Sequence, residues 1–282
     1  MAHLTDLPAE LQSQILSYCD LSSLIAAIGS YSVWRQSCTL RDVHPTRRRL
    51  LDMYLHLVRS KTFLASRACV KKVCERFDRE EYIRKMERQR GIVAVPADFR
   101  MYILEWPEWA VFDSLWPGMP LNLDISGSAM LFRRRGKNLL HHDTKHFQNM
   151  AMFDIDPEHR GREQMSITAL GLWKPRRGAG VGTWLVVGTH PLSGCILTSP
   201  IFNNEREEPA TVALNIPFID WLSMSAQRFS SGITEDGRPL EPFGHWKALE
   251  NRSSGVWPLQ CILFLVHLCF QFIKLLVSLF SV

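Results

Sequence analysis

Residues 7–18 read Leu7-Pro8-Ala9-Glu10-Leu11-Gln12-Ser13-Gln14-Ile15-Leu16-Ser17-Tyr18, and this stretch decides the fold of the N-terminal part of the chain. Together with Leu4, the apolar residues Leu7, Leu11, Ile15 and Tyr18 recur three or four positions apart, which places them on one face of a helix. Leu16 widens that stripe, and Pro8 stands where the first turn of a helix tolerates proline. The stretch therefore predicts an amphipathic helix.

Two more short helices are predicted directly after it. Ser22-Ser23 can cap a second helix that carries Leu24 and residues 25–28, and Gly29-Ser30 ends this helix before a third one with Val33-Trp34. Three short helices within residues 4–40 cannot bury all their apolar faces on one another. The surplus of apolar surface predicts a protein partner.

The pattern Leu7-Pro8-x-Glu10-Leu11-x-x-x-Ile15-Leu16-x-Tyr18, followed by Leu21-x-x-Leu24 and Trp34-Arg35, resembles the F-box over residues 4–40. The resemblance implies a three-helix module that binds the adaptor subunit of SCF-type cullin-RING ubiquitin ligases. The residues that it implies for the adaptor face, or for its support, are Leu7, Pro8, Glu10, Leu11, Ile15, Leu16, Leu24 and Trp34. Residues 29–32 depart from the family, which more often carries a Val-Cys-like dipeptide before the tryptophan. A leucine-rich helix of the ordinary core type is the competing interpretation.

A basic segment follows this module. Residues 41–90 contain 15 Lys and Arg against 7 Asp and Glu, so the basic excess behind the formal net charge of +5 is local and the rest of the chain is close to balanced. The segment has no recognisable groove-binding motif, and no exposed aromatic residues alternate with its basic residues. No nucleic-acid partner is therefore expected. Helical spacing of apolar residues from Leu50 to Val58 favours a solvated helical face. We therefore expect an F-box over residues 1–50 and a basic helical linker over 51–78.

A second family pattern begins near residue 79. Tyr82, Ile83 and Met86 predict a helix ended by Gly91, and Val95-Pro96-Ala97-Asp98-Phe99 starts another that continues through 102–104. Glu87, Gly91, Val95-Pro96, Asp98-Phe99 and Tyr102-Ile103-Leu104 resemble the opening of the SUKH superfamily of Smi/Knr-type domains. Residues 105–108 depart from that family, which more often has an Asn-Gly turn there. The resemblance implies helices packed on one antiparallel sheet that serves as a protein-binding platform without chemistry.

Downstream patterns agree with such an α+β domain over residues 79–250. Strands are predicted over 166–173, 183–189 and 195–199, with a turn at Pro191-Leu192-Ser193-Gly194 between the last two. Residues 216–222 resemble the late helix of the family. The predicted fold class is thus α+β: a three-helix F-box, a helix-on-antiparallel-sheet domain and a hydrophobic C-terminal helix.

No catalytic residue, metal site or cofactor is identifiable. Glycines 178, 180 and 182 precede a strand, whereas a phosphate-binding loop follows one. His142 and His146 are four residues apart, beside His141 and Asp143, yet no remote third zinc ligand can be recognised. We interpret them as a polar surface patch. The proline-punctuated Trp106, Trp109 and Trp116 are candidate target-binding residues, although large aromatics also fill cores.

The C-terminal tail, residues 258–282, combines apolar residues with a polar stripe. Leu259–Val282 is long enough to cross a hydrocarbon core of about 30 Å. Its polar residues recur at helical spacing and so share one stripe: Gln260, His267, Gln271, Lys274, Ser278 and Ser281. Its apolar residues favour insertion by about 5 to 10 kcal/mol, and a central lysine opposes it by about 2.5 to 3.5 kcal/mol. A tail anchor, an amphipathic helix buried within the protein and a misread gene end remain open.

The sequence favours recruitment over catalysis. The N-terminus has neither a basic n-region nor an apolar h-region, and the seven cysteines include no C-x-x-C pair. Cytoplasm or nucleus is expected, with membrane association if the tail inserts. The leading interpretation is a substrate-recruiting subunit that joins a ligase adaptor and cullin complex to an unidentified protein substrate. The alternatives are a tail-anchored membrane scaffold without a ligase role and a hydrolase hidden in the middle domain.

Overall fold

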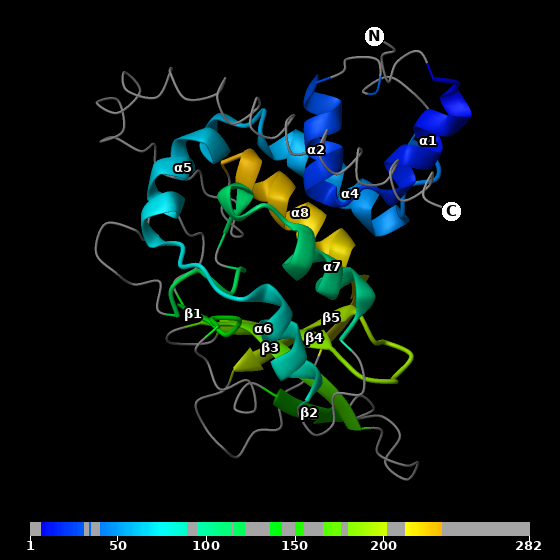
Figure 1. Cartoon of the computed structure of the whole chain (residues 1–282). Helices are drawn as coiled ribbons and strands as arrows, with labels where there is room; N and C mark the ends of the chain where they lie inside the picture. Colours follow the sequence, from blue (N-terminus) through cyan, green and yellow to red (C-terminus); the bar gives the residue numbers. More distant parts are fainter. Residues whose placement is uncertain are drawn as a thin grey trace. The chain divides into compact units, whose positions relative to one another are not determined.

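The computed structural model describes residues 7–30, 34, 40–88, 95–113, 115–121, 136–142, 150–154, 166–175, 180–201 and 212–232. They fall into two compact units, one that ends at Asp42 and one that begins at Val43. The chain is α+β, as the sequence predicts: helices come first, and an antiparallel sheet packed with a helix follows (Figure 1). The predicted C-terminal helix, residues 258–282, lies outside the described residues.

The first unit contains helix α1 (Ala9–Tyr18) and helix α2 (Leu21–Ser30). Helix α2 begins earlier than Ser22-Ser23 would place it, because the Asp20 carboxylate accepts a hydrogen bond from the Ser23 amide at 2.7 Å and caps the helix. Of the predicted third helix only Trp34 is described; it is helical and buried.

The described part of the second unit contains six helices. They are α4 (Pro45–Leu57), α5 (Lys61–Val73), α6 (Arg79–Glu87), α7 (Ala97–Glu105), the 3-10 helix η3 (Glu108–Ala110) and α8 (Phe218–Ser230). Pro45 occupies the first turn of α4, and side chains of Ser60 and Asp78 cap α5 and α6.

Residues 51–78, predicted as a basic helical linker, are largely helical and belong to the second unit. They complete α4 and form α5, and both helices pack against α8 inside the second unit. Leu50, Leu57 and Phe63 are buried there without exposed surface. Basic residues of this segment reach partners that are distant in sequence: Arg67, for example, donates to the carbonyls of Trp109 and Val111.

The sheet is antiparallel, and its strand β3 (Ser166–Pro175) pairs with strands on both of its sides. On one side β4 (Gly180–Val186), β5 (Cys195–Ile201) and β6 (Val212–Pro217) follow in order. On its other side β1 (Gly136–Asn138) and β2 (Met150–Asp154) pair with successive parts of β3. The turn between β4 and β5 places Gly194 at a φ of 85°, and its amide donates to the Val186 carbonyl at 2.9 Å.

Sequence spacing located the strands unevenly. Strands β3 and β5 start at the predicted residues, whereas β4 covers 180–186 and not 183–189. Ile216-Pro217, predicted to start the late helix, ends β6, and α8 begins at Phe218 because Pro217 stands at its N-cap.

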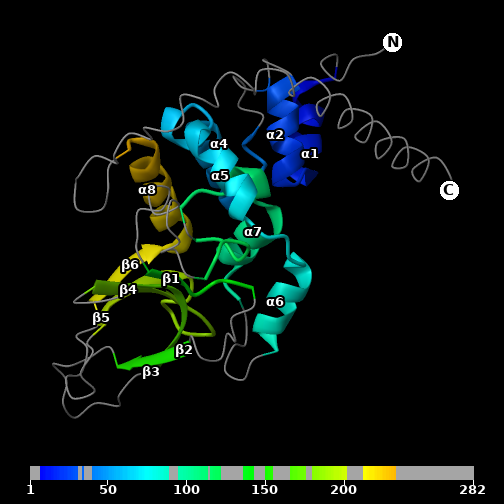
Figure 2. The same ribbon diagram turned by 90° about the vertical axis from the view of Figure 1, so that its left-hand side faces the viewer.

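Helix α8 lies between the sheet and helices α4 and α5 (Figure 2). Its buried Phe218 packs against Phe99 and Tyr102 of α7, with ring centroids 5.3 and 5.7 Å apart. A second cluster on the sheet is formed by the buried residues Ile167, Ala169, Val186 and Leu197. Within the described part of the chain, no helix has the length and hydropathy that a membrane span requires.

Candidate functional sites

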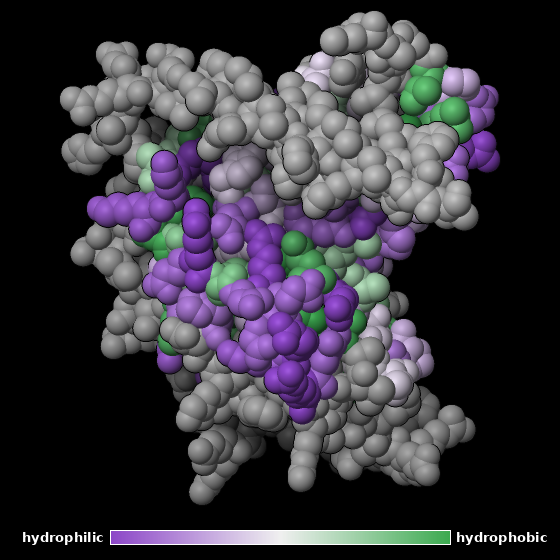
Figure 3. All heavy atoms as spheres, in the orientation of Figure 1, coloured by the Kyte–Doolittle hydropathy of each residue, from purple (hydrophilic) through white to green (hydrophobic). Residues whose placement is uncertain are grey.

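Helix α1 presents apolar side chains to solvent. Leu11 is 46% exposed and Tyr18 is 82% exposed, while Leu7 and Ile15 are partly exposed. Leu11, Ile15 and Tyr18 lie on one stripe of the helix because they are spaced four and three residues apart, and Leu7 comes just before its N-cap, Pro8. These four residues are here called the α1 outer face. Figure 3 shows hydrophobic surface at this helix. The outer face is therefore the predicted stripe, turned away from the core of its own unit.

Polar contacts hold the opposite side of α1. The buried Gln12 accepts a hydrogen bond from Trp34 Nε1 at 2.6 Å and donates to the Leu7 carbonyl at 2.8 Å. Ser13 donates to the Asp42 carboxylate at 2.6 Å. Since buried polar groups must be paired, these bonds fix which side of α1 faces inward. Leu11 and Ile15 are then directed outward.

The remaining residues of the predicted adaptor site divide into two groups. Leu16, Leu24 and Trp34 are buried, with exposures of 1%, 0% and 4%, and can only support the outer face. Pro8 and Glu10 are exposed at the start of α1, where Glu10 also lies in the first turn. A carboxylate there interacts favourably with the helix dipole.

The three candidate target-binding tryptophans lie in different environments. Trp106 and Trp116 have no exposed surface, and both rings contact the buried Tyr102 ring, at centroid distances of 5.8 and 5.4 Å. Trp109 is 48% exposed and sets its ring edge-on to Tyr54 at 5.3 Å. Trp109 is therefore the tryptophan of this set that a partner can reach.

Arg67 fixes the segment that carries Trp109. Its guanidinium donates to the carbonyls of Trp109 and Val111 at 2.5 and 2.6 Å, and it lies 3.7 Å from the Phe63 ring centroid. Desolvation by burial lowers the pKa of Arg67 to about 9. One turn earlier on α5, Leu64 is 50% exposed, so α5 and η3, which pack together, each offer one exposed apolar side chain.

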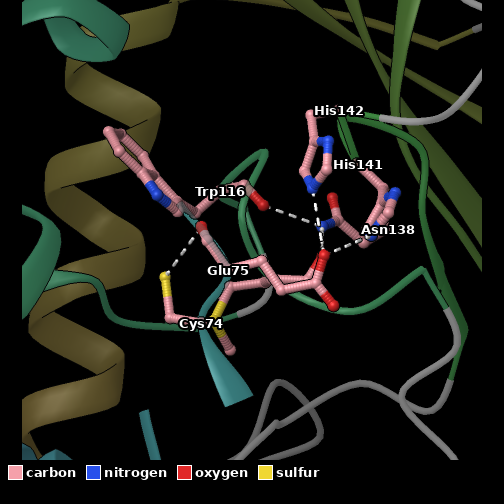
Figure 4. A network of polar contacts seen from close by, with 7 residues as sticks. Cys74, Glu75, Trp116, Asn138, His141 and His142 are labelled. Atoms are coloured by element: carbon pink, nitrogen blue, oxygen red, sulfur yellow. Dashed lines mark hydrogen bonds and ion pairs between the residues drawn. The ribbon is translucent and has the colours of Figure 1, made fainter. Parts of the chain in front are cut away.

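A polar cluster not recognisable from the sequence joins Glu75 to the two neighbouring histidines (Figure 4). The Oε2 atom of Glu75 lies 3.1 Å from His142 Nε2 and 4.0 Å from His141 Nε2. The two imidazoles stack with centroids 4.6 Å apart and planes 21° apart, and His142 also stacks on Phe77. His142 lies in a turn, and residues 143–149, with Asp143 and His146, lie outside the described residues.

Backbone hydrogen bonds place both sides of this cluster. The Glu75 amide donates to the Gly118 carbonyl at 2.7 Å, and the His142 amide donates to the Pro117 carbonyl at 2.9 Å. The buried Asn138 amide group donates to the carbonyls of Trp116 and Met119 at 2.8 and 2.9 Å. One turn, residues 116–119, thus holds the carboxylate and the imidazoles together.

Sequence reasoning missed Glu75 because 67 residues separate it from His142 and no spacing rule connects them. The Tyr82 hydroxyl, which donates to the Leu140 carbonyl at 2.9 Å beside the histidines, was equally hidden. Burial raises the pKa of Tyr82 far above its ordinary value, so its phenol stays a donor at neutral pH.

No protein-family model, no curated protein and no solved structure matches the chain.

Proposed function

We propose that the first unit is an F-box that docks on the adaptor of an SCF-type ubiquitin ligase through the α1 outer face. The observation that carries the proposal is the exposure of Leu11 and Tyr18 on a helix whose opposite side is fixed by buried hydrogen bonds. A leucine-rich core helix would bury this stripe and leave its polar side in water. In α1 the apolar stripe is outside and Gln12 and Ser13 are inside.

The energetics favour a protein partner for this face. Removing one leucine side chain from water contributes about 1.5 to 3 kcal/mol, and several such residues in one stripe can supply most of a specific interface. Leu7, Pro8 and Leu11 would contact the adaptor directly. Leu16, Leu24 and Trp34 would keep α1 in place from behind.

We propose further that the second unit holds the protein to be ubiquitinated and contributes no chemistry of its own. The half-exposed Trp109 on η3, and Leu64 on the neighbouring α5, support a target surface at this place. Aromatic side chains that offer a large area with few rotatable bonds are enriched among the residues that dominate protein interfaces. The resemblance to SUKH domains, which act as binding platforms, agrees with this role.

The test is affinity purification of the full chain from its native host, with quantitative mass spectrometry of wild type and two matched variants. Leu11→Glu and Leu64→Glu place the same charge at sites of similar exposure, 46% and 50%. We expect Leu11→Glu to lose the adaptor and cullin while it keeps the remaining partners. Leu64→Glu should keep the adaptor and cullin and lose a target.

The double variant Leu7→Ala/Pro8→Ala provides a second probe of the same face and should also lose the adaptor. Retention of adaptor and cullin by both α1 variants, with their folds intact by circular dichroism, would remove the basis of the proposal. Recovery of membrane proteins alone by the wild-type chain would favour the tail-anchored scaffold instead.

A further inference from the structure

We propose that Glu75, His141 and His142 form a binding site for a divalent transition metal ion, with zinc as the metal of choice. The three side chains each offer one ligand atom, and these atoms lie within 4.8 Å of one another. The site belongs to the second unit, whereas the α1 outer face belongs to the first.

The donor set selects the class of metal. Two imidazole nitrogens and one carboxylate oxygen suit zinc and its first-row neighbours, whereas calcium and magnesium prefer oxygen ligands alone. Zinc binds such His₂Glu sets through three protein ligands and keeps a fourth position for water or another ligand. The exposure of the Glu75 side chain, 59%, leaves that fourth position accessible from solvent.

The three ligand atoms gather around one point, with a spacing wider than that of an occupied site. Both imidazole Nε2 atoms approach the same carboxylate oxygen, at 3.1 and 4.0 Å. Ligand atoms about 2.0 to 2.1 Å from a tetrahedral zinc ion are about 3.3 Å from one another. Binding therefore needs the widest pair of ligand atoms to close by up to about 1.5 Å, through rotation of the exposed Glu75 carboxylate and of the two stacked imidazoles.

The backbone around the ligands is already fixed. Neighbouring carbonyls of one turn, Pro117 and Gly118, accept the amides of His142 and Glu75. The His142 ring is held further by stacking on Phe77, with ring planes 5° apart. Rigid placement of this kind lowers the entropic cost of bringing three ligands to one ion. A bound ion would join the connection between α5 and α6 to the turn after β1.

Zinc and cobalt(II) titrations of the full-length chain test the proposal. Cobalt(II) replaces zinc in tetrahedral sites and reports imidazole and carboxylate ligation through its visible absorption bands. We expect the wild-type chain to bind one equivalent of metal that Glu75→Gln and His141→Ala/His142→Ala lose, together with the corresponding cobalt bands. Zinc should also raise the melting temperature of the wild type, because it binds the folded state.

The matched controls are Glu80→Gln and His44→Ala, which change the same residue types at exposed positions outside the cluster. Both should keep the equivalent that the cluster variants lose. All variants keep the cysteines, so any metal that the cysteines bind is the same in the control and the cluster variants and cancels in the comparison. Circular dichroism checks that the cluster variants are folded; Glu75→Gln preserves the shape of the side chain and is the safer of the two. Equal metal stoichiometry in the wild type and in Glu75→Gln, or no binding by the wild type, would overturn the proposal.

Discussion

Gly118 illustrates how a single position can determine the candidate metal cluster. A Cβ atom added to Gly118 would lie 2.1 Å from the Glu75 carbonyl oxygen, and the obstacle is backbone that cannot rotate away. An alanine at this position would therefore push the backbones of residues 75 and 118 apart, at the place where the Glu75 amide donates to the Gly118 carbonyl.

We predict that Gly118→Ala lowers the free energy of unfolding by about 1 to 3 kcal/mol, the usual cost of overpacking. Urea denaturation followed by tryptophan fluorescence measures it. Gly29→Ala is the control: a Cβ at this helical position meets no atom within 4 Å, and alanine favours a helix over glycine by up to about 1 kcal/mol. A Gly118→Ala protein as stable as the wild type would contradict the described approach of the two backbones.

At the scale of elements, α4 is tied to two other helices by ion pairs of different burial. Arg47 holds Glu105 at the end of α7 through two hydrogen bonds of 2.7 Å, and both side chains are less than a fifth exposed. Arg49 pairs with Asp220 of α8 through one contact of 2.6 Å, with exposures of 51% and 43%. Solvent screens the second pair much more than the first.

Double-mutant cycles to alanine should therefore give unequal coupling energies. We expect about 1 to 2 kcal/mol for Arg47 with Glu105, because paired, partly buried hydrogen bonds between charged groups are strong. For Arg49 with Asp220 we expect about 0.5 kcal/mol or less. The measurement is the free energy of unfolding of each single and double variant in low salt. Equal couplings would mean that burial does not govern how α4 is attached.

The sequence predicted helices better than strands, and the difference is physical. Helix spacing is local, so α1, α6 and α7 could be located within a few residues. Strands β1 and β2 are short and gain their stability from pairing with the distant β3, which no local pattern reveals. Likewise, Trp106 and Trp116 carry the same local signals as Trp109, and only the tertiary packing distinguishes the two buried rings from the exposed one.

The candidate sites divide in the same way. The α1 outer face follows from one helical stripe and was predictable, whereas its outward direction depends on Gln12, whose partner Trp34 is 22 residues away. The Glu75 cluster forms where the connection between α5 and α6 meets the turn after β1, with the turn at 116–119 bonded to both. A site can therefore be predicted from the sequence when one helix or strand carries all its residues. It cannot when the residues are far apart in the sequence and only the tertiary fold brings them together.

For the whole molecule, two fully buried tyrosines contribute to a loss of stability at alkaline pH. Tyr82 and Tyr102 donate to the carbonyls of Leu140 and Leu115, and desolvation raises the pKa of both phenols far above its ordinary value. Below about pH 10 each is neutral in the folded and the unfolded state, so these two phenols add no pH dependence to stability there. Above that pH only the unfolded chain releases the protons, so folding stability falls as pH rises.

We predict a loss that approaches about 1.4 kcal/mol per pH unit for each of the two tyrosines above pH 10. Chemical denaturation at a series of alkaline pH values measures it. The variant Tyr82→Phe/Tyr102→Phe should have a shallower slope, and Tyr18→Phe, at an exposed site, should keep the wild-type slope. If the double variant loses stability as steeply as the wild type, the two phenols are not responsible.

The C-terminal tail bears on where the whole molecule resides, and its sequence alone makes it a candidate anchor. We predict that the full-length chain stays with membranes washed in alkaline carbonate, and that a chain without residues 258–282 is released, because apolar residues outweigh the one central lysine. Release of the full-length chain would exclude a spanning anchor.

The central claim is that α1 docks the ligase adaptor through its outer face, and calorimetric titration of the purified full-length chain with the purified adaptor tests it most directly. We predict saturable binding that Leu11→Glu weakens by at least about tenfold, since losing one buried leucine contact corresponds to about 1.5 to 3 kcal/mol. Leu64→Glu should bind as the wild type does. No binding by the folded wild-type chain, or equal binding by the wild type and Leu11→Glu, would contradict the claim.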